Sequence, residues 1–219
     1  MQEPFDLLIQ GGLVVTGAGI TKADVGVRGE KITAIGIGLE TDGVGRIVDA
    51  TGKVVLPGII DVHVHPVYED NVQDCSRVAA HGGTTSLLFF AYGRTGDSLL
   101  KKVTEMRDDG LANSLLDFGL HGGMFEAPRQ VPEIPSVMDL GVGTFKFFLT
   151  YLKQGWYTDD YQFIKAMDML AERGGLAMVH AENGGGIDLL EDKYLTGPNA
   201  SASNFNRSRP AALEEEAVI

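Results

Sequence analysis

Cysteine is almost absent from this sequence, since Cys75 is the only one among 219 residues. A single cysteine excludes an internal disulfide framework and is typical of a reducing compartment such as the cytoplasm. Basic residues are also scarce: 18 lysines and arginines face 30 aspartates and glutamates, which gives a formal net charge of −12. Such an acidic chain is not expected to bind nucleic acid or an anionic membrane surface. We find no apolar run long enough to span a bilayer, and Met1–Gln10 lack the pattern of a secretory signal.

The composition is otherwise that of an ordinary globular protein, with 44% hydrophobic and 22% charged residues, and its length predicts one or two domains. Residues 1–55 contain short apolar or alternating runs separated by turn-forming pairs such as Gly11-Gly12 and Asp42-Gly43. We predict strands over residues 5–9, 13–15, 24–28, 32–37 and 46–48. This small β unit is too thin to bury two faces by itself.

From residue 56 the pattern changes to apolar strands that alternate with helices, which is typical of a parallel sheet covered on both faces. We predict strands over residues 59–65, 84–90, 115–120, 144–149 and 176–180, and helices over residues 71–80, 98–108, 131–140 and 159–173. Without a glycine-rich phosphate motif, these strands favour a (β/α) barrel over a doubly wound dinucleotide fold.

A TIM-type barrel has eight strands and about 250 residues. We therefore expect an α/β protein in which residues 56–219 are the first five βα units of a (β/α)8 barrel, truncated after about the fifth strand. The alternative is a complete but unusual five-stranded α/β domain.

The stretch from Pro57 to Pro66 ends an apolar strand with two histidines, His63 and His65. Alternate side chains of a strand share a face, so Asp61 and the two histidines are expected to point the same way, with the histidines about 7 Å apart. Two imidazoles at that spacing can bind one metal ion, and Asp61 is a candidate to orient one of them. The alternative is a strand with two partly exposed histidines near its end.

Polar residues also occur on later strands, with Lys146 on the fourth and His180 at the end of the fifth. The C-terminal ends of barrel strands open on one face, where active sites are built. Lys146 lies within the apolar run Phe145-Lys146-Phe147-Phe148, where burial would lower the pKa of its ammonium group. Three outcomes stay open: a neutral amine that acts as a base or forms a Schiff base, a carbamate that bridges two divalent ions, or an amine that reaches solvent.

Five motifs occur in an order that resembles the successive signatures of one family. They are Pro57-Gly58-Ile59-Ile60-Asp61-Val62-His63-Val64-His65, Gly82-Gly83-Thr84-Thr85, Phe145-Lys146-Phe147-Phe148, Val179-His180-Ala181-Glu182-Asn183-Gly184 and Ser208-Arg209-Pro210. As a set they resemble the dihydropyrimidinase/hydantoinase group of the cyclic amidohydrolases, within the amidohydrolase superfamily. The resemblance covers essentially the whole chain.

This resemblance implies a metal-dependent hydrolase that opens a cyclic amide, a dihydropyrimidine or hydantoin ring, with a hydroxide that bridges two metal ions. By match to the family, His63 and His65 bind one divalent ion, N6-carboxylated Lys146 bridges two, and His180 binds the second. Zinc is the expected ion, and manganese or cobalt would fit similar sites. Tyr151, five residues after Lys146, matches the tyrosine that stabilises the oxyanion in the family.

The resemblance also has implications for the rest of the molecule. Residues 1–55 would be the N-terminal part of a small β-sandwich, and the protein would be a cytoplasmic homo-oligomer, a tetramer in the family. The general base and acid of the family, a histidine and an aspartate on later strands, are expected beyond Ile219, so that these 219 residues lack part of the site.

Two features of the sequence differ from the family pattern. Dihydroorotases and allantoinases usually place a distinctive arginine or asparagine soon after the two histidines, and the segment Pro66-Val67-Tyr68-Glu69-Asp70-Asn71 argues against a dihydroorotase in particular. It also departs from the Met/Pro/Phe-Gly pattern common in dihydropyrimidinases, so the exact ring and stereospecificity stay open. His121, expected to end the third strand, could face the pocket but matches no family ligand. The alternative function is a non-catalytic dihydropyrimidinase-like protein, or an inactive fragment that acts as a binding or assembly module.

Overall fold

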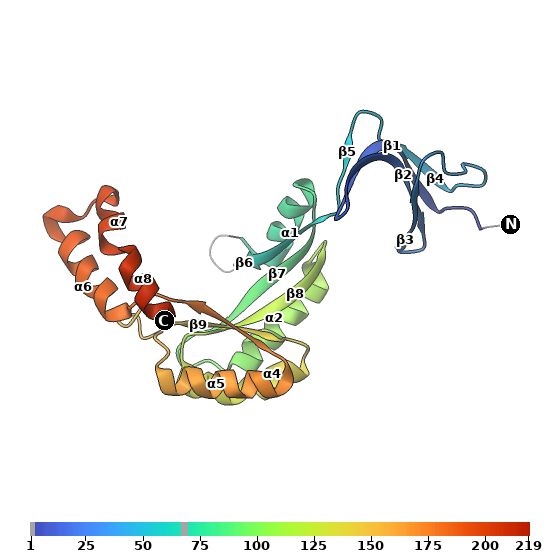
Figure 1. The fold of residues 1–219 in the computed structure, drawn as a ribbon. Helices are drawn as coiled ribbons and strands as arrows, with labels where there is room; N and C mark the ends of the chain where they lie inside the picture. Colours follow the sequence, from blue (N-terminus) through green and yellow to red (C-terminus); the bar gives the residue numbers. More distant parts are fainter. Residues whose placement is uncertain (1–2, 67–69) are drawn as a thin grey trace. The chain divides into compact units, whose positions relative to one another are not determined.

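The computed structural model describes residues 3–66 and 70–219, and the chain divides into two compact units, Met1–Gly58 and Ile59–Ile219 (Figure 1). Each unit is built on one five-stranded sheet. Within the described ranges, none of the helices combines the length and apolar character needed to cross a bilayer.

The first unit is a sheet of two antiparallel hairpins with two short parallel additions. The strands are β1 (Leu7–Thr16), β2 (Gly19–Arg28), β3 (Lys31–Gly36), β4 (Arg46–Asp49) and β5 (Val54–Val55). Their order is β3-β2-β1-β4, and β5 also pairs with β1.

The prediction of separate strands over residues 5–9 and 13–15 is wrong, because β1 continues through Gly11-Gly12. The register with β2 shifts between Ile9 and Gly12, and Gly11 has a φ of 76°. Glycine adopts this left-handed conformation without a steric penalty, so the pair forms a bulge within the strand rather than a turn.

One face of this sheet buries only a small cluster, Val14, Ala23 and Val25. Larger apolar side chains such as Ile20 and Ile32 stay 69% and 64% exposed. Residues 3–58 supply a single sheet, so the second layer of a sandwich stays a prediction.

The second unit contains a parallel sheet whose strand order follows the sequence, β10-β9-β8-β7-β6. The strands are β6 (Ile59–Val64), β7 (Thr84–Gly93), β8 (Asp117–Met124), β9 (Thr144–Phe148) and β10 (Leu176–His180). A sequential order without reversal is that of a barrel wall rather than a doubly wound sheet. The parallel α/β architecture is therefore confirmed, and the sheet is visibly curled (Figure 1).

Helices connect these strands and continue after the last one. They are α1 (Val72–His81), α2 (Leu99–Asn113), α3 (Ala127–Gln130), the 3-10 turn Val131–Glu133, α4 (Ile134–Asp139), α5 (Asp160–Arg173), α6 (Gly184–Tyr194), the 3-10 turns Gly197–Asn199 and Ala202–Asn204, α7 (Phe205–Ser208) and α8 (Ala211–Val218). The main core lies between one face of the sheet and α2, α4 and α5, with Phe145 and Phe147 of β9 fully buried in it. The alternate residues of β9, including Lys146, consequently face the other side.

Side-chain caps fix where several helices begin. Ser98 accepts a hydrogen bond from the Lys101 N–H, and Asn71 and Asp159 cap α1 and α5 in the same way. Helix α5 ends at Gly174, whose φ of 70° is the usual left-handed stop.

Two predicted boundaries are wrong for packing reasons. Helix α2 runs past residue 108 through Gly110, where a Cβ would lie 2.4 Å from the Phe118 ring, so the helix needs glycine there to approach β8. Strand β8 covers Asp117–Met124 rather than residues 115–120, because rings of Phe145 and Tyr92 pack over Gly122 and Gly123 and keep these residues in the sheet. His121 therefore lies inside the strand and not at its end.

Candidate active site

The C-terminal end of β6 brings His63 and His65 together. Their ring centroids are 4.9 Å apart, and both rings contact Phe90 of β7, at 4.5 and 4.7 Å. Burial lowers the pKa of His65, and the positive charges of His63 and Lys146 lower it further to a smaller extent. A neutral imidazole keeps a lone pair, which is the form that binds a metal ion.

Lys146 projects from β9 on the face opposite to the main core. Its Nζ lies 5.6 Å from the centroid of the Phe148 ring, and the residue is half-buried. Burial lowers the pKa of the Lys146 ammonium group, which increases the share of neutral amine at a given pH. A neutral amine is the nucleophilic form of lysine.

His180 closes β10 beside the loop that follows β9. The backbone N–H of Leu149 donates to the His180 carbonyl at 3.0 Å, which extends the pairing of the two strands beyond their ends. The imidazole Nε2 lies 2.8 Å from Oε2 of Glu182.

Tyr151 occupies the loop between β9 and α5 in an unusual conformation. Among the described residues it is the only non-glycine residue with a positive φ, 64°. The loop is held by hydrogen bonds from the Trp156 N–H to the Tyr151 carbonyl at 3.2 Å and from the Thr158 N–H to the Phe148 carbonyl at 2.8 Å. The Tyr151 ring packs edge-on against the His180 ring at 5.2 Å. A strained residue that the surrounding structure holds in place is common at functional sites.

These side chains surround one cavity of about 190 Å³. Its lining contains all five predicted site residues, His63, His65, Lys146, Tyr151 and His180, together with Tyr92, Phe125, Phe148 and Trp156. The structure thus brings together residues that are up to 117 positions apart in the sequence, from His63 to His180.

The aromatic wall was not predicted from the sequence. Trp156 stacks on Phe125 at 4.2 Å, and Phe125 stacks on Tyr92 at 4.7 Å. Tyr92 near the end of β7 and Phe125 just after β8 occupy strand-end positions, which is the signal that could have identified them. Trp156 lies in a loop, where no strand pattern indicates its direction.

The donor chemistry of the cavity fits a divalent ion such as zinc, which takes imidazole and carboxylate ligands. Among the residues that the structure describes, however, no three or more histidine, cysteine, aspartate and glutamate side chains form a cluster that could hold a metal.

The Asp61 carboxylate accepts a hydrogen bond from the backbone N–H of His63 at 3.1 Å, and its role in orienting an imidazole stays a prediction. His121 is 3% exposed and does not line the cavity. Its Nε2 lies 3.0 Å from the Val62 carbonyl, and its Nδ1 contacts Oγ1 of Thr144. The segment that departs from the family pattern includes Val67, Tyr68 and Glu69, which lie outside the described residues.

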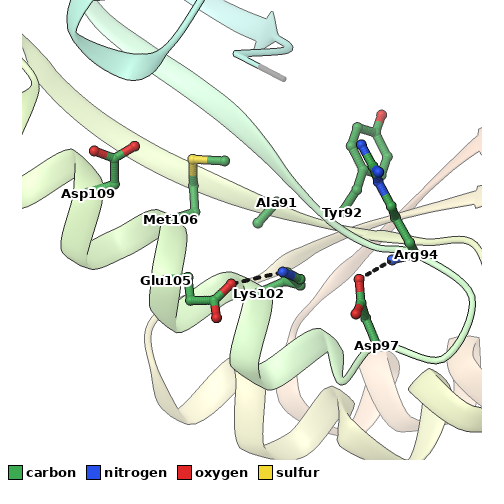
Figure 2. A pocket seen from close by; sticks show the side chains of 8 residues that line it. All are labelled: Ala91, Tyr92, Arg94, Asp97, Lys102, Glu105, Met106 and Asp109. Atoms are coloured by element: carbon green, nitrogen blue, oxygen red, sulfur yellow. Dashed lines mark hydrogen bonds and ion pairs between the residues drawn. The ribbon is translucent and has the colours of Figure 1, made fainter. Parts of the chain in front are cut away.

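A larger hollow of about 640 Å³ lies beside helix α2 and the end of β7 (Figure 2). Its charged side chains interact locally: Nζ of Lys102 lies 2.9 Å from Oε2 of Glu105, and Asp97 accepts from the Arg94 N–H at 3.1 Å. The lining of this larger hollow contains no histidine, so the smaller cavity is the better candidate for metal chemistry.

Comparison with known proteins agrees with the geometry. The chain is 36% identical over 223 residues to a D-hydantoinase of Ralstonia pickettii, which covers 97% of this chain and 48% of that protein. It is 33% identical over 226 residues to a dihydropyrimidinase of Rattus norvegicus, which covers 97% of this chain and 43% of that protein. The chain is a homologue of hydantoinases and dihydropyrimidinases.

Solved structures extend the similarity to the fold. A D-hydantoinase superposes with a TM-score of 0.87 at 34% identity, covering 97% of this chain and 48% of that one. The L-hydantoinase from Arthrobacter aurescens superposes with a TM-score of 0.86 at 27% identity, covering 98% and 49%. No family model matches the chain. The chain spans about half the length of these hydantoinase relatives.

Proposed function

We propose that the cavity is part of the active site of a cyclic amidohydrolase that opens a hydantoin or dihydropyrimidine ring. The observation that carries this proposal is the convergence of His63, His65, Lys146, His180 and Tyr151 on one cavity. The names of the homologues, which include D-hydantoinase, L-hydantoinase and dihydropyrimidinase, support the same class of substrate. Because the chain spans about half of their length, turnover is proposed for a protein that also supplies the remaining site residues.

The proposed cofactor is a pair of divalent ions, with zinc as the expected metal. Lys146 would hold both after addition of carbon dioxide to its neutral amine, which yields a carbamate and releases a proton. The lowered pKa of Lys146 supports this step, because only the neutral amine reacts.

Bound ions of this kind polarise the substrate carbonyl and activate water. The chain itself would contribute orientation and charge stabilisation. His63 and His65 would hold one ion and His180 the other, and the Tyr151 hydroxyl would donate to the oxygen on which negative charge develops. The strained backbone of Tyr151 and its contacts with His180 and Trp156 support a fixed position for that hydroxyl.

The exposed edge of the sheet supports a larger barrel. The side chains of Ile59, Ile60 and Val62 in β6 are 55%, 60% and 58% exposed, an unusual degree for an apolar strand. We propose that further strands of a (β/α)8 barrel cover this edge. A homo-oligomeric state and a cytoplasmic location rest on the family resemblance and on the single cysteine.

The test is hydrolysis of hydantoin and dihydrouracil by the complete natural protein loaded with zinc in the presence of 13C-bicarbonate. We expect ring opening and a carbamate carbon resonance, both lost in Lys146→Ala. Lys153→Ala is the matched control. The Nζ of Lys153 forms an ion pair with Oδ1 of Asp192 at 2.6 Å, and Lys153 does not line the cavity. A Lys146→Ala protein that keeps two metal ions and full activity would refute the proposal.

A further inference from the structure

Three charged side chains beside His180 have no part in the proposed chemistry. They are Glu182 in the loop after β10, Glu191 in α6, and Arg209 in the Ser208-Arg209-Pro210 motif. The side chains of Glu182 and Arg209 are only 13% and 20% exposed. Charged side chains are rarely this buried unless they are paired.

Arg209 joins two elements through its guanidinium group. Its Nη1 lies 3.3 and 3.2 Å from Oε1 and Oε2 of Glu182, and its Nη2 lies 2.5 Å from Oε1 of Glu191. The guanidinium carbon also lies 5.0 Å from the centroid of the Phe205 ring. These contacts restrict the position of the Glu182 carboxylate relative to β10.

Glu182 in turn contacts the imidazole of His180, with Oε2 2.8 Å from Nε2. An ionised carboxylate can only accept a hydrogen bond, so Nε2 must carry the proton. In a neutral ring the lone pair then lies on Nδ1. Carboxylates that fix the tautomer of a metal-binding histidine in this way are common next to metal sites.

We propose that Glu182 and Arg209 are positioning residues that hold His180 as the Nε2–H tautomer and so leave Nδ1 as the nitrogen that can bind a metal ion. Glu182 acts directly on the ring, and Arg209 acts through Glu182. The inference rests on the proposed function for the role of the metal, but the tautomer can be measured without metal.

The experiment is long-range 1H–15N NMR of the metal-free chain labelled with 15N-histidine, at about pH 8.5, where histidine is ordinarily neutral. The signals of His180 are assigned with His180→Asn. We expect the wild-type ring to be protonated on Nε2, and both tautomers to be populated in Glu182→Ala. Arg209→Met should shift the ring in the same direction, and Arg209→Lys should do so less.

Asp192→Asn is the matched control, since it removes an ion pair of α6 with Lys153 but leaves the His180–Glu182 contact intact. It should give the wild-type tautomer. Zinc affinity, measured by calorimetry, should fall about 10–100-fold in Glu182→Ala and stay unchanged in Asp192→Asn.

A wild-type His180 protonated on Nδ1, or an unchanged tautomer in Glu182→Ala, would overturn the inference. If Glu182→Ala does not fold, the tautomer of His180 in Arg209→Met decides it. Failure of the proposed function looks different: no form of the protein would bind zinc, although the tautomer would be the one predicted here.

Discussion

Gln130 holds two of the loops that carry the aromatic wall of the cavity, and its replacement should be costly. The side chain is fully buried. Its Oε1 accepts hydrogen bonds from the N–H groups of Phe125 and Glu126, both at 3.1 Å, and its Nε2 donates to the Gly93 carbonyl at 3.0 Å. The amide therefore ties the loop after β8 to the end of β7.

Gln130→Met keeps the length of the side chain but removes these three bonds, together with two longer ones from Nε2 to the carbonyls of Arg94 and Asp97, both at 3.3 Å. At about 1 kcal/mol for each of the three shorter bonds, the variant should lose about 3 kcal/mol of unfolding free energy or more. This is a large part of the roughly 5–15 kcal/mol that stabilises a typical domain. Methionine recovers only apolar packing at this position, so the loss should be clearly measurable.

The assay is guanidinium unfolding followed by the fluorescence of Trp156, the single tryptophan, which stacks on Phe125 at 4.2 Å. Gln162→Met is the matched control, because Oε1 of Gln162 is buried without a hydrogen-bond partner among the described residues. The control should lose less than about 1 kcal/mol. Equal midpoints for Gln130→Met and the wild type, or equal losses in both variants, would refute the reasoning.

Three further predictions concern single side chains. Tyr151→Phe should lower kcat of the complete enzyme about 10²–10³-fold with metal content intact, and an unchanged kcat would exclude the oxyanion role. Burial lowers the pKa of His121 below its usual 6.5, so the unfolded chain binds a proton that the folded chain does not. Stability should therefore fall as the pH drops from about 6.5, and part of this slope should disappear in His121→Gln. Burial raises the pKa of the Cys75 thiol, so iodoacetamide at about pH 8 should alkylate it more slowly in the folded chain than in guanidinium; equal rates would contradict this.

The regular part of the fold could be predicted because its signals are local. Apolar runs and caps such as Ser98 and Asp159 mark the strands and helices of the second unit within a few residues. The errors occur where packing between distant residues overrides local propensity. Gly110 stays in a helix because Phe118 fills the space of its missing side chain, and Gly122-Gly123 stay in a strand because Phe145 and Tyr92 cover them.

The candidate site likewise contains residues that local patterns predict and contacts that they do not. His63, His65, Lys146 and His180 stand at positions that the strand pattern sends to one edge, and the structure places them around one cavity. The contact between His180 and Glu182 and the position of Arg209 depend on how α6 and residues 202–209 fold back, which no local pattern indicates.

Zinc titration of the chain by calorimetry, with bicarbonate present, is the most direct test of a metal centre in this cavity. The account predicts binding by the wild type, loss of binding in His63→Ala with His65→Ala, and unchanged binding in His81→Ala, which alters an exposed histidine at the end of α1. Equal zinc binding by the wild type and the His63→Ala, His65→Ala variant would contradict it.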